Sequence, residues 1–218
     1  MKTSPHCQLL AFAFSCVALI TSVRAQATPV VVTNLVFAAQ HDPAVIKTDT
    51  GDRYSVRFPE GAWGRVDKWT AGRVLELVYD EKEGASLRDQ LTKELLPLTY
   101  WPEGKHPLDL QLQSLLSSDD AASTQGIVEA YDAFIPKWEA EVSRAYAMLK
   151  VLPELSKKDR KNVEASQKAW KQFYASQTNA LASVLFSRDG TIWRIEAASA
   201  HLCLVQSQAH QLYTLLHY

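Results

Sequence analysis

The chain has little of what supports disulfide stabilisation, metal binding or nucleic-acid binding. Its 218 residues include only three cysteines, and 23 Lys+Arg are balanced by 24 Asp+Glu. Without a basic excess there is no reason to expect a nucleic-acid partner. The apolar stretch at 9–20 is shorter than the about 20 residues that a membrane-spanning helix needs. The composition therefore makes a nucleic-acid-binding or a membrane-spanning protein an unfavoured interpretation of this chain.

A secretory signal is predicted at residues 1–25. Lys2 and His6 precede the apolar stretch, and Val23 and Ala25 place small residues ahead of the expected cleavage point. We expect cleavage before Gln26 and no transmembrane segment afterwards. The expected location is therefore periplasmic or secreted, in a Gram-negative bacterium.

Cys203 is the only cysteine that would remain after this cleavage. The cleavage also changes the formal charge from −1 to −3, because it removes two basic residues and no acidic ones. A lone thiol cannot form an internal disulfide. Because Cys203 lies between Leu202 and Leu204, we expect a buried, unpaired and structural thiol. The histidines lack the spacing of a zinc site, so neither a metal nor a cofactor is predicted.

The first half of the chain shows a hydrophobic period of two. Short alternating runs bounded by polar turns are typical of a small antiparallel barrel or sandwich. Pro97 would place its strand at an edge, because proline cannot donate to a strand ladder. The segments predicted as strands are 30–32, 35–37, 45–48, 54–58, 73–79, 96–100 and 108–112.

Two short strings in this half have competing interpretations. Asp49, Thr50 and Gly51 form the tripeptide of aspartic proteases, but that chemistry needs two carboxylates that share a proton. Asp and Gly are ordinary hairpin residues, so we interpret the string as a turn. Trp69 and Gly72 resemble a connection in small exported β-barrel domains of the Src-homology type. A core tryptophan beside a turn glycine is the alternative.

Three apolar stripes at helical spacing follow the polar segment 117–126, and Pro153 and Gly190 separate them. Each stripe is wide enough to face a core, and short connections make neighbouring helices antiparallel. The fold class is therefore a small antiparallel β-barrel or sandwich followed by a three-helix antiparallel bundle. The predicted parts are a signal peptide (1–25), an all-β domain (26–116), a linker (117–126) and a helical bundle domain (127–218).

The middle stripe contains Gln167, Trp170 and Phe173 in a Q-K-A-W-K-Q-F run, and the preceding helix places Tyr146 in an A-E-V-S-R-A-Y pattern. Together with Cys203 in the last helix, these residues resemble the LprI-type lysozyme-inhibitor family. The paired cysteines of that family are mostly absent. The resemblance implies a protein partner, namely lysozyme or another peptidoglycan hydrolase.

No catalytic set can be assembled from the sequence. Cys203 and His210 share a helix face, but seven residues separate them by about 10 Å along the axis, which is beyond proton-transfer reach. We therefore predict that the protein is not an enzyme.

The predicted partner-binding residues are Ser187, Arg188, Asp189, Trp193 and Arg194. A muramidase cleft presents two carboxylates, which a guanidinium complements. Arg and Trp are also common hot-spot residues. An ordinary helix–helix loop with a core tryptophan is the alternative.

These features predict an exported, non-enzymatic binding protein of the bacterial envelope that inhibits a lysozyme (muramidase). The alternative is a periplasmic immunity protein or an envelope scaffold, in which the β domain recognises a protein or peptide. The sequence favours no particular oligomeric state.

Overall fold

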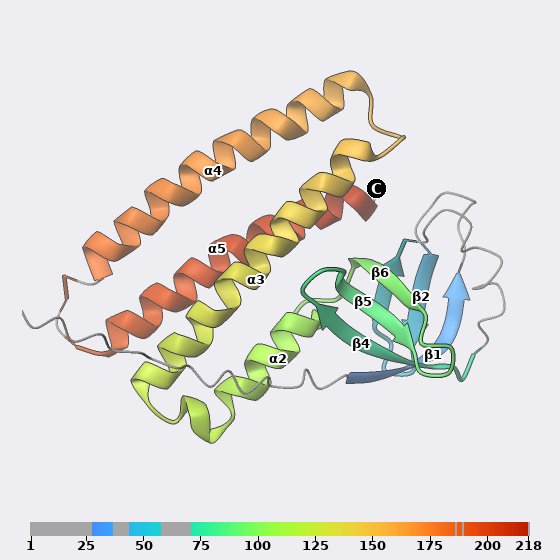
Figure 1. Cartoon of the computed structure of the whole chain (residues 1–218), viewed down its shortest axis with the longest axis horizontal. Helices are drawn as coiled ribbons and strands as arrows, with labels where there is room; N and C mark the ends of the chain where they lie inside the picture. Colours follow the sequence, from blue (N-terminus) through green and yellow to red (C-terminus); the bar gives the residue numbers. More distant parts are fainter. Residues whose placement is uncertain (1–27, 37–43, 58–70, 186, 189, 218) are drawn as a thin grey trace, which may run out of the picture.

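The computed structural model describes residues 28–36, 44–57, 71–185, 187–188 and 190–217. The predicted signal peptide, Trp69 and Asp189 lie outside the described residues. Within these ranges the chain is a β-sheet followed by helices, which confirms the predicted order (Figure 1). In the described part of the chain, each helix is too short or too polar to cross a membrane.

Six strands form one antiparallel sheet, ordered β1-β2-β3-β6-β5-β4, and β4 also pairs with β1. Alternate residues of β2 and β4 are buried, as the period of two predicts, among them Ile46 and Leu75. The strands are β1 (Thr28–Val36), β2 (Ala44–Thr48), β3 (Arg53–Val56), β4 (Val74–Asp80), β5 (Gly84–Asp89) and β6 (Leu95–Tyr100).

The turn predicted at 49–51 is confirmed. It joins β2 to β3, and Gly51 has φ 87°, a conformation that disfavours a side chain. The backbone N–H of Gly51 donates to the carbonyl of Thr48 at 3.0 Å. Asp49 is an exposed turn residue, so the protease-like string is structural.

The strand predicted at 108–112 is wrong, because these residues belong to helix α2 (Pro107–Leu116). Pro107 occupies the first helical turn, and His106 caps the helix by accepting a hydrogen bond from the N–H of Leu108. Leu108 and Leu112 are four residues apart, so both face the core from one side of a helix. Alternating leucines fit either structure, and here the cap and the burial of the Leu108–Leu112 face both favour the helix.

Pro97 does not mark an edge strand, since β6 lies between β3 and β5. Its carbonyl accepts a hydrogen bond from the N–H of Arg57, just beyond the end of β3. The pairing of β3 with β6 is irregular between Ser55 and Val56. Pro97, which lacks an N–H, therefore lies where the hydrogen-bond ladder between β3 and β6 is irregular, so a proline is tolerated in this internal strand. Strand β5, which has no β-branched residue, was not predicted from sequence.

The three long predicted helices are present, and α2 and a short 3₁₀ helix η1 (Asp119–Ala121) precede them. The structure thus has more helices than the expected three. A capping box starts α4, because Ser156 accepts from the N–H of Asp159 and Asp159 accepts from that of Ser156. The long helices are α3 (Thr124–Val151), α4 (Lys157–Leu185) and α5 (Ile192–His217).

Helices α3 and α5 make the helical core, and α4 lies on their far side from the sheet (Figure 1). Trp138 and Leu149 of α3 and Val205 of α5 are fully buried, and Leu202 is nearly so. Gln167 is the only buried residue of α4. The second predicted stripe therefore packs less deeply than the other two.

The sheet and the helices share one continuous hydrophobic core. At their junction Trp101, His106, Trp138, His210 and Tyr213 pack ring against ring, with centroids of successive pairs 4.4–6.2 Å apart. Aromatic pairs at such distances add to the stability that burial supplies. The junction therefore fixes the bundle against the sheet.

Candidate functional site

Four of the predicted partner-binding residues are described, namely Ser187, Arg188, Trp193 and Arg194. They lie at the corner between α4 and α5, which is the end of the bundle remote from the sheet (Figure 1). Ser187, Arg188 and Arg194 are exposed, and Trp193 is half-buried. The guanidinium of Arg188 stacks over the Trp193 ring, 4.4 Å from its centroid. The structure thus brings Arg188 and Trp193 together.

The backbone of this corner is held by local hydrogen bonds. The Ser187 hydroxyl donates to the carbonyl of Val184 at 3.0 Å, and the N–H of Arg188 donates to that of Leu185 at 3.2 Å. Gly190 has φ 110°, which a residue with a side chain rarely adopts. The turn therefore needs glycine at this position.

The corner carries apolar surface as well as charge. Ile192, the first residue of α5, is 55% exposed. The stacking leaves the edge of the Arg188 guanidinium, and so its N–H donors, available to a ligand. The corner combines a cation held over an aromatic ring with an exposed aliphatic side chain.

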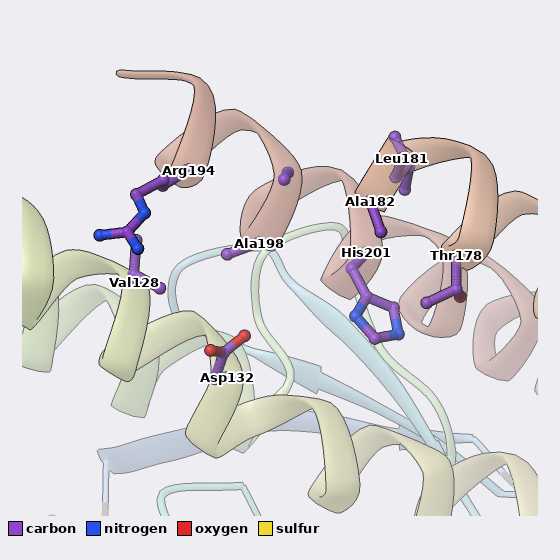
Figure 2. A pocket seen from close by; sticks show the side chains of 9 residues that line it. Val128, Asp132, Thr178, Leu181, Ala182, Arg194, Ala198 and His201 are labelled. Carbon is purple, nitrogen blue, oxygen red and sulfur yellow. The ribbon is translucent and has the colours of Figure 1, made fainter. Parts of the chain in front are cut away.

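A cavity of about 90 Å³ opens beside the corner between α3, α4 and α5. Figure 2 shows Asp132 between Arg194 and His201, with Thr178 on the opposite wall. The cavity is large enough for a few waters or one small side chain. Its lining residues are Val128, Asp132, Thr178, Leu181, Ala182, Arg194, Ala197, Ala198 and His201.

A short hydrogen-bonded chain fixes the ring of His201 in this wall. The Tyr174 hydroxyl donates to the carboxylate of Glu139 at 2.8 Å. The Nε2 atom of His201 lies 2.6 Å from the hydroxyl oxygen of Tyr174. Because that hydroxyl has one proton, His201 must donate from Nε2. Burial, followed by the carboxylate of Glu139, raises the pKa of Tyr174. The tyrosine therefore stays neutral near pH 7.

The family-type motif residues have different environments. Gln167 is buried and accepts a hydrogen bond from Gln208 at 2.9 Å. Trp170 is half-buried and stacks on Tyr174, with centroids 5.0 Å apart. Phe173 is 49% exposed. Trp170 thus supports the wall of the cavity, while Phe173 belongs to the surface.

Tyr146 is half-buried against the shared core, and Lys150 lies over its ring at 5.7 Å. Cys203 is free and exposed, which contradicts the predicted buried thiol. The buried positions on either side of it, Leu202 and Val205, point to the core, and Cys203 is turned about 100° from Leu202 around the helix. Apolar neighbours in sequence therefore did not imply burial.

A second polar cluster lies at the junction between sheet and bundle. The Tyr213 hydroxyl donates to Glu141 at 2.6 Å, and Arg144 pairs with the same carboxylate. Arg144 also donates to the carbonyls of Glu81 and Lys82 at 3.1 and 3.2 Å. Burial raises the pKa of Glu141, against the opposing effect of Arg144. This cluster joins elements of the fold and lies inside it.

The structure separates Cys203 and His210, the nucleophile–base pair considered from the sequence, and brings no metal ligands together in the part of the chain that it describes. Within the described ranges, no three His, Cys, Asp or Glu side chains gather as metal ligands. Cys203 is exposed on α5, whereas His210 is half-buried between Trp101 and Trp138. Burial lowers the pKa of His210, so the ring is neutral near pH 7.

Sequence reasoning missed Asp132, Thr178 and His201 as members of one cavity. Val128 and Asp132 are four apart on α3, which places them on one helix face. That spacing was the only signal in the sequence, because the other walls come from α4 and α5. The helix pairing was needed to bring the three residues together.

Residues 117–215 match the family described as Lysozyme inhibitor LprI. The match begins just before η1 and extends through almost all of α5. The family resemblance seen in the sequence is thereby confirmed for the helical part. Comparison with curated proteins and with solved structures gave no match.

Proposed function

We propose that the protein is exported, loses residues 1–25 and inhibits a muramidase through its helical half without catalysis of its own. The observation that carries this proposal is the match to an inhibitor family over the part of the chain that forms the helices. An extracytoplasmic location, periplasmic or secreted, follows from the same proposal. The exposed corner and adjacent cavity supply a surface for the partner.

The α4–α5 corner is the part of the bundle best shaped to enter a sugar cleft. It lies at the end of α4 and α5 that is remote from the sheet, and α5 belongs to the core that the bundle shares with the sheet. Arg188 is already positioned by Trp193, so little side-chain freedom is lost on binding. A guanidinium in this position complements the two carboxylates of a muramidase cleft.

The cavity would receive a polar side chain at the rim of the partner. Asp132 is exposed at its mouth, and His201 is held as a donor toward Tyr174. A cationic or hydroxyl group could bind Asp132 there once Arg188 occupies the cleft. In this proposal Arg188 and Trp193 are the central anchors, and the cavity adds specificity.

The amino-terminal sheet would stabilise and present the bundle. The pairing of β4 with β1 supports the small-barrel class expected from sequence. Its junction with α3 and α5 leaves the α4–α5 corner uncovered. A separate ligand for the sheet would belong to the scaffold alternative.

The test is clearing of a peptidoglycan suspension by muramidases of several types, with and without residues 26–218. Inhibition is expected, and Arg188→Glu should weaken it by about 2–5 kcal/mol in binding free energy, because a carboxylate replaces the anchor. Arg53→Glu is the matched control, since Arg53 is exposed on β3 in the sheet. It should inhibit as the wild type does.

Full clearing with every muramidase would refute inhibition and favour the immunity or scaffold role. Inhibition that survives Arg188→Glu would move the contact surface away from the corner. Thermal unfolding of both variants should match the wild type, because both side chains are exposed.

A further inference from the structure

The cavity beside the α4–α5 corner has a carboxylate without a partner in its wall. Asp132 of α3 lines the cavity and is exposed at its mouth. Among the described residues, no side chain forms a salt bridge or a hydrogen bond with this carboxylate, and Arg194 on the same wall does not pair with it. The cavity therefore presents a negative charge that is available to a ligand.

His201 contributes a hydrogen-bond acceptor to the same cavity. Its Nε2 atom donates to the Tyr174 hydroxyl, because that hydroxyl gives its own proton to Glu139. In the neutral imidazole the other nitrogen, Nδ1, must then be an acceptor. Figure 2 shows one ring nitrogen on the side of Thr178 and the other on the side of Asp132. Because Tyr174 lies one turn before Thr178 on α4, the nitrogen on the side of Asp132 is Nδ1.

The rest of the cavity wall offers a ligand apolar surface and few donors. The Thr178 hydroxyl donates to the carbonyl of Tyr174 at 2.9 Å, so its proton is already used. Arg194 at the mouth is the one lining side chain with free N–H donors in the part of the wall that the structure describes. A ligand that enters between Asp132 and His201 must therefore bring its own donors. The apolar lining residues are Val128, Leu181, Ala182, Ala197 and Ala198.

We propose that this cavity binds a basic side chain of the muramidase, which is an organic cation with N–H donors on an aliphatic stem. The cation pairs with Asp132 and donates to Nδ1 of His201, while the stem packs on the alanines of the wall. A hydroxyl group has a single proton and cannot satisfy both acceptors, and a carboxylate would be repelled. The identity of the partner rests on the proposed function, whereas the binding of a cation does not.

Tyr174 and Glu139 are positioning residues in this proposal, because they act through His201. The hydroxyl of Tyr174 accepts the proton of Nε2, which fixes both the ring and the tautomer. Trp170 stacks on the Tyr174 ring, with centroids 5.0 Å apart, and so supports it from behind. The tryptophan of the family-type motif is thereby connected to the cavity through two side chains.

The first test is an NMR titration of residues 26–218 at about pH 8 with n-butylammonium and with n-butylguanidinium. At least one of these cations should shift the resonances of the cavity residues, with an affinity in the millimolar range that is usual for so small a ligand. n-Butanol is the neutral control, and it should bind much more weakly. Binding of neither cation, or equal binding of n-butanol, would overturn the proposal.

Variants of the wall assign the binding to its two acceptors. Asp132→Asn should weaken cation binding about fivefold, a modest factor because the carboxylate is exposed. The matched control is Glu196→Gln, which removes the same charge from an exposed position of α5 outside the cavity and should change binding by less than about twofold. His201→Phe keeps a ring, removes Nδ1 and should weaken binding about threefold. Equal losses in Asp132→Asn and Glu196→Gln, or no loss in His201→Phe, would overturn the two-acceptor site.

Nitrogen NMR of the His201 ring tests the positioning role. In the wild type it should show one tautomer, with the proton on Nε2, and in Tyr174→Phe the second tautomer should appear. The phenylalanine keeps the aromatic ring that stacks on Trp170, so a merely structural role would leave the tautomer unchanged. A wild-type ring with its proton on Nδ1, or a single tautomer in the variant, would contradict the proposal.

The clearing assay tests whether the cation belongs to the muramidase. Its lysines are acetylated in one preparation and its arginines are modified with phenylglyoxal in another, and only preparations that still clear peptidoglycan are compared. One of the two modifications should weaken inhibition by the wild type about fivefold more than inhibition by Asp132→Asn, because the variant has already lost the contact. Equal effects on both proteins would overturn the assignment to the partner. With no inhibition of unmodified muramidase the proposed function fails, and the titration with the two cations still decides whether the site exists.

Discussion

Replacing Arg144 tests whether its ion pair joins the sheet to the bundle. Glu141 is fully buried, and its carboxylate is bound by Arg144 and by the Tyr213 hydroxyl. Arg144→Met keeps most of the apolar volume and removes the cation. The variant leaves a buried carboxylate with only neutral partners, the Tyr213 hydroxyl and the backbone of Ala85. Arg144 also donates to two carbonyls of the turn before β5, and these hydrogen bonds would be lost.

The expected loss in the free energy of unfolding is about 3 kcal/mol near neutral pH. Removing one partner of a buried ion pair costs about 3–5 kcal/mol, and the lower value applies because the Arg144 side chain is 20% exposed. For a domain of this size the melting temperature should fall by about 6–12 °C. Urea unfolding measures the change, and Arg188→Met, at an exposed position, is the control that should change stability by less than about 0.5 kcal/mol.

The pH dependence of this loss follows from Glu141. Burial raises its pKa in the folded protein, and the charge of Arg144 opposes the rise. Without Arg144 the pKa of Glu141 rises further, so the folded state binds the proton more readily than the unfolded state. Protonation of Glu141 therefore stabilises the folded variant. This stabilisation is fully present below the pKa that Glu141 has in the unfolded chain, and it disappears as pH rises through the higher pKa of Glu141 in the folded protein. The loss should therefore be smaller near pH 4 than near pH 8.

A rescue variant completes the test. Glu141→Gln in the Arg144→Met background removes the unpaired charge and should recover about 2 kcal/mol near neutral pH. If the free energy of unfolding of Arg144→Met alone lies within about 1 kcal/mol of the wild-type value, the structural role of the pair is refuted. An equal loss at both pH values, or no recovery in the double variant, would show that the buried charge is not the cause.

Three further predictions concern single positions. Burial raises the pKa of Asp109 to about 6. As pH falls from about 7 to about 4, the free energy of unfolding of the wild type should therefore rise by about 1–2 kcal/mol relative to that of Asp109→Asn, as measured by urea unfolding. Exposed Cys203 should react rapidly with a thiol reagent in the folded protein, and Cys203→Ser should change stability by less than about 0.5 kcal/mol; slow labelling would contradict the exposure. Gly126→Ala should destabilise by about 1–3 kcal/mol in thermal unfolding, because its Cβ would lie 2.2 Å from the carbonyl oxygen of Asp120. A more stable Gly126→Ala variant would show that this approach is not tight.

The sequence by itself determined the local structure and the family of the helical part. Ser156 and Asp159 specify the start of α4, and Gly51 specifies the hairpin, because caps and turns depend on residues that are neighbours in the chain. The Trp170 run identified the family that matches 117–215. Helical spacing also predicted the buried faces of α3 and most of α5.

Tertiary structure decided which of several compatible local patterns was used. The leucines from Leu108 to Leu112 fit a strand or a helix, and packing against α3 and β4 favours the helix that His106 caps. Cys203 and Phe173 are apolar positions that the pairing of the helices leaves exposed. Burial depends on which face meets another element, and the sequence of one helix does not specify its neighbour.

The sites depend even more on distant contacts. Glu141 and Tyr213 are 72 residues apart in sequence, and Tyr174 and His201 are 27 apart, yet each pair is joined by a hydrogen bond. Arg188 and Trp193 could be predicted as a pair because one turn holds both. Local order therefore follows from the sequence. The junction arises only when α3 and α5 pack against the sheet, and the cavity arises only when α3, α4 and α5 pack together, because the residues of each come from separate elements.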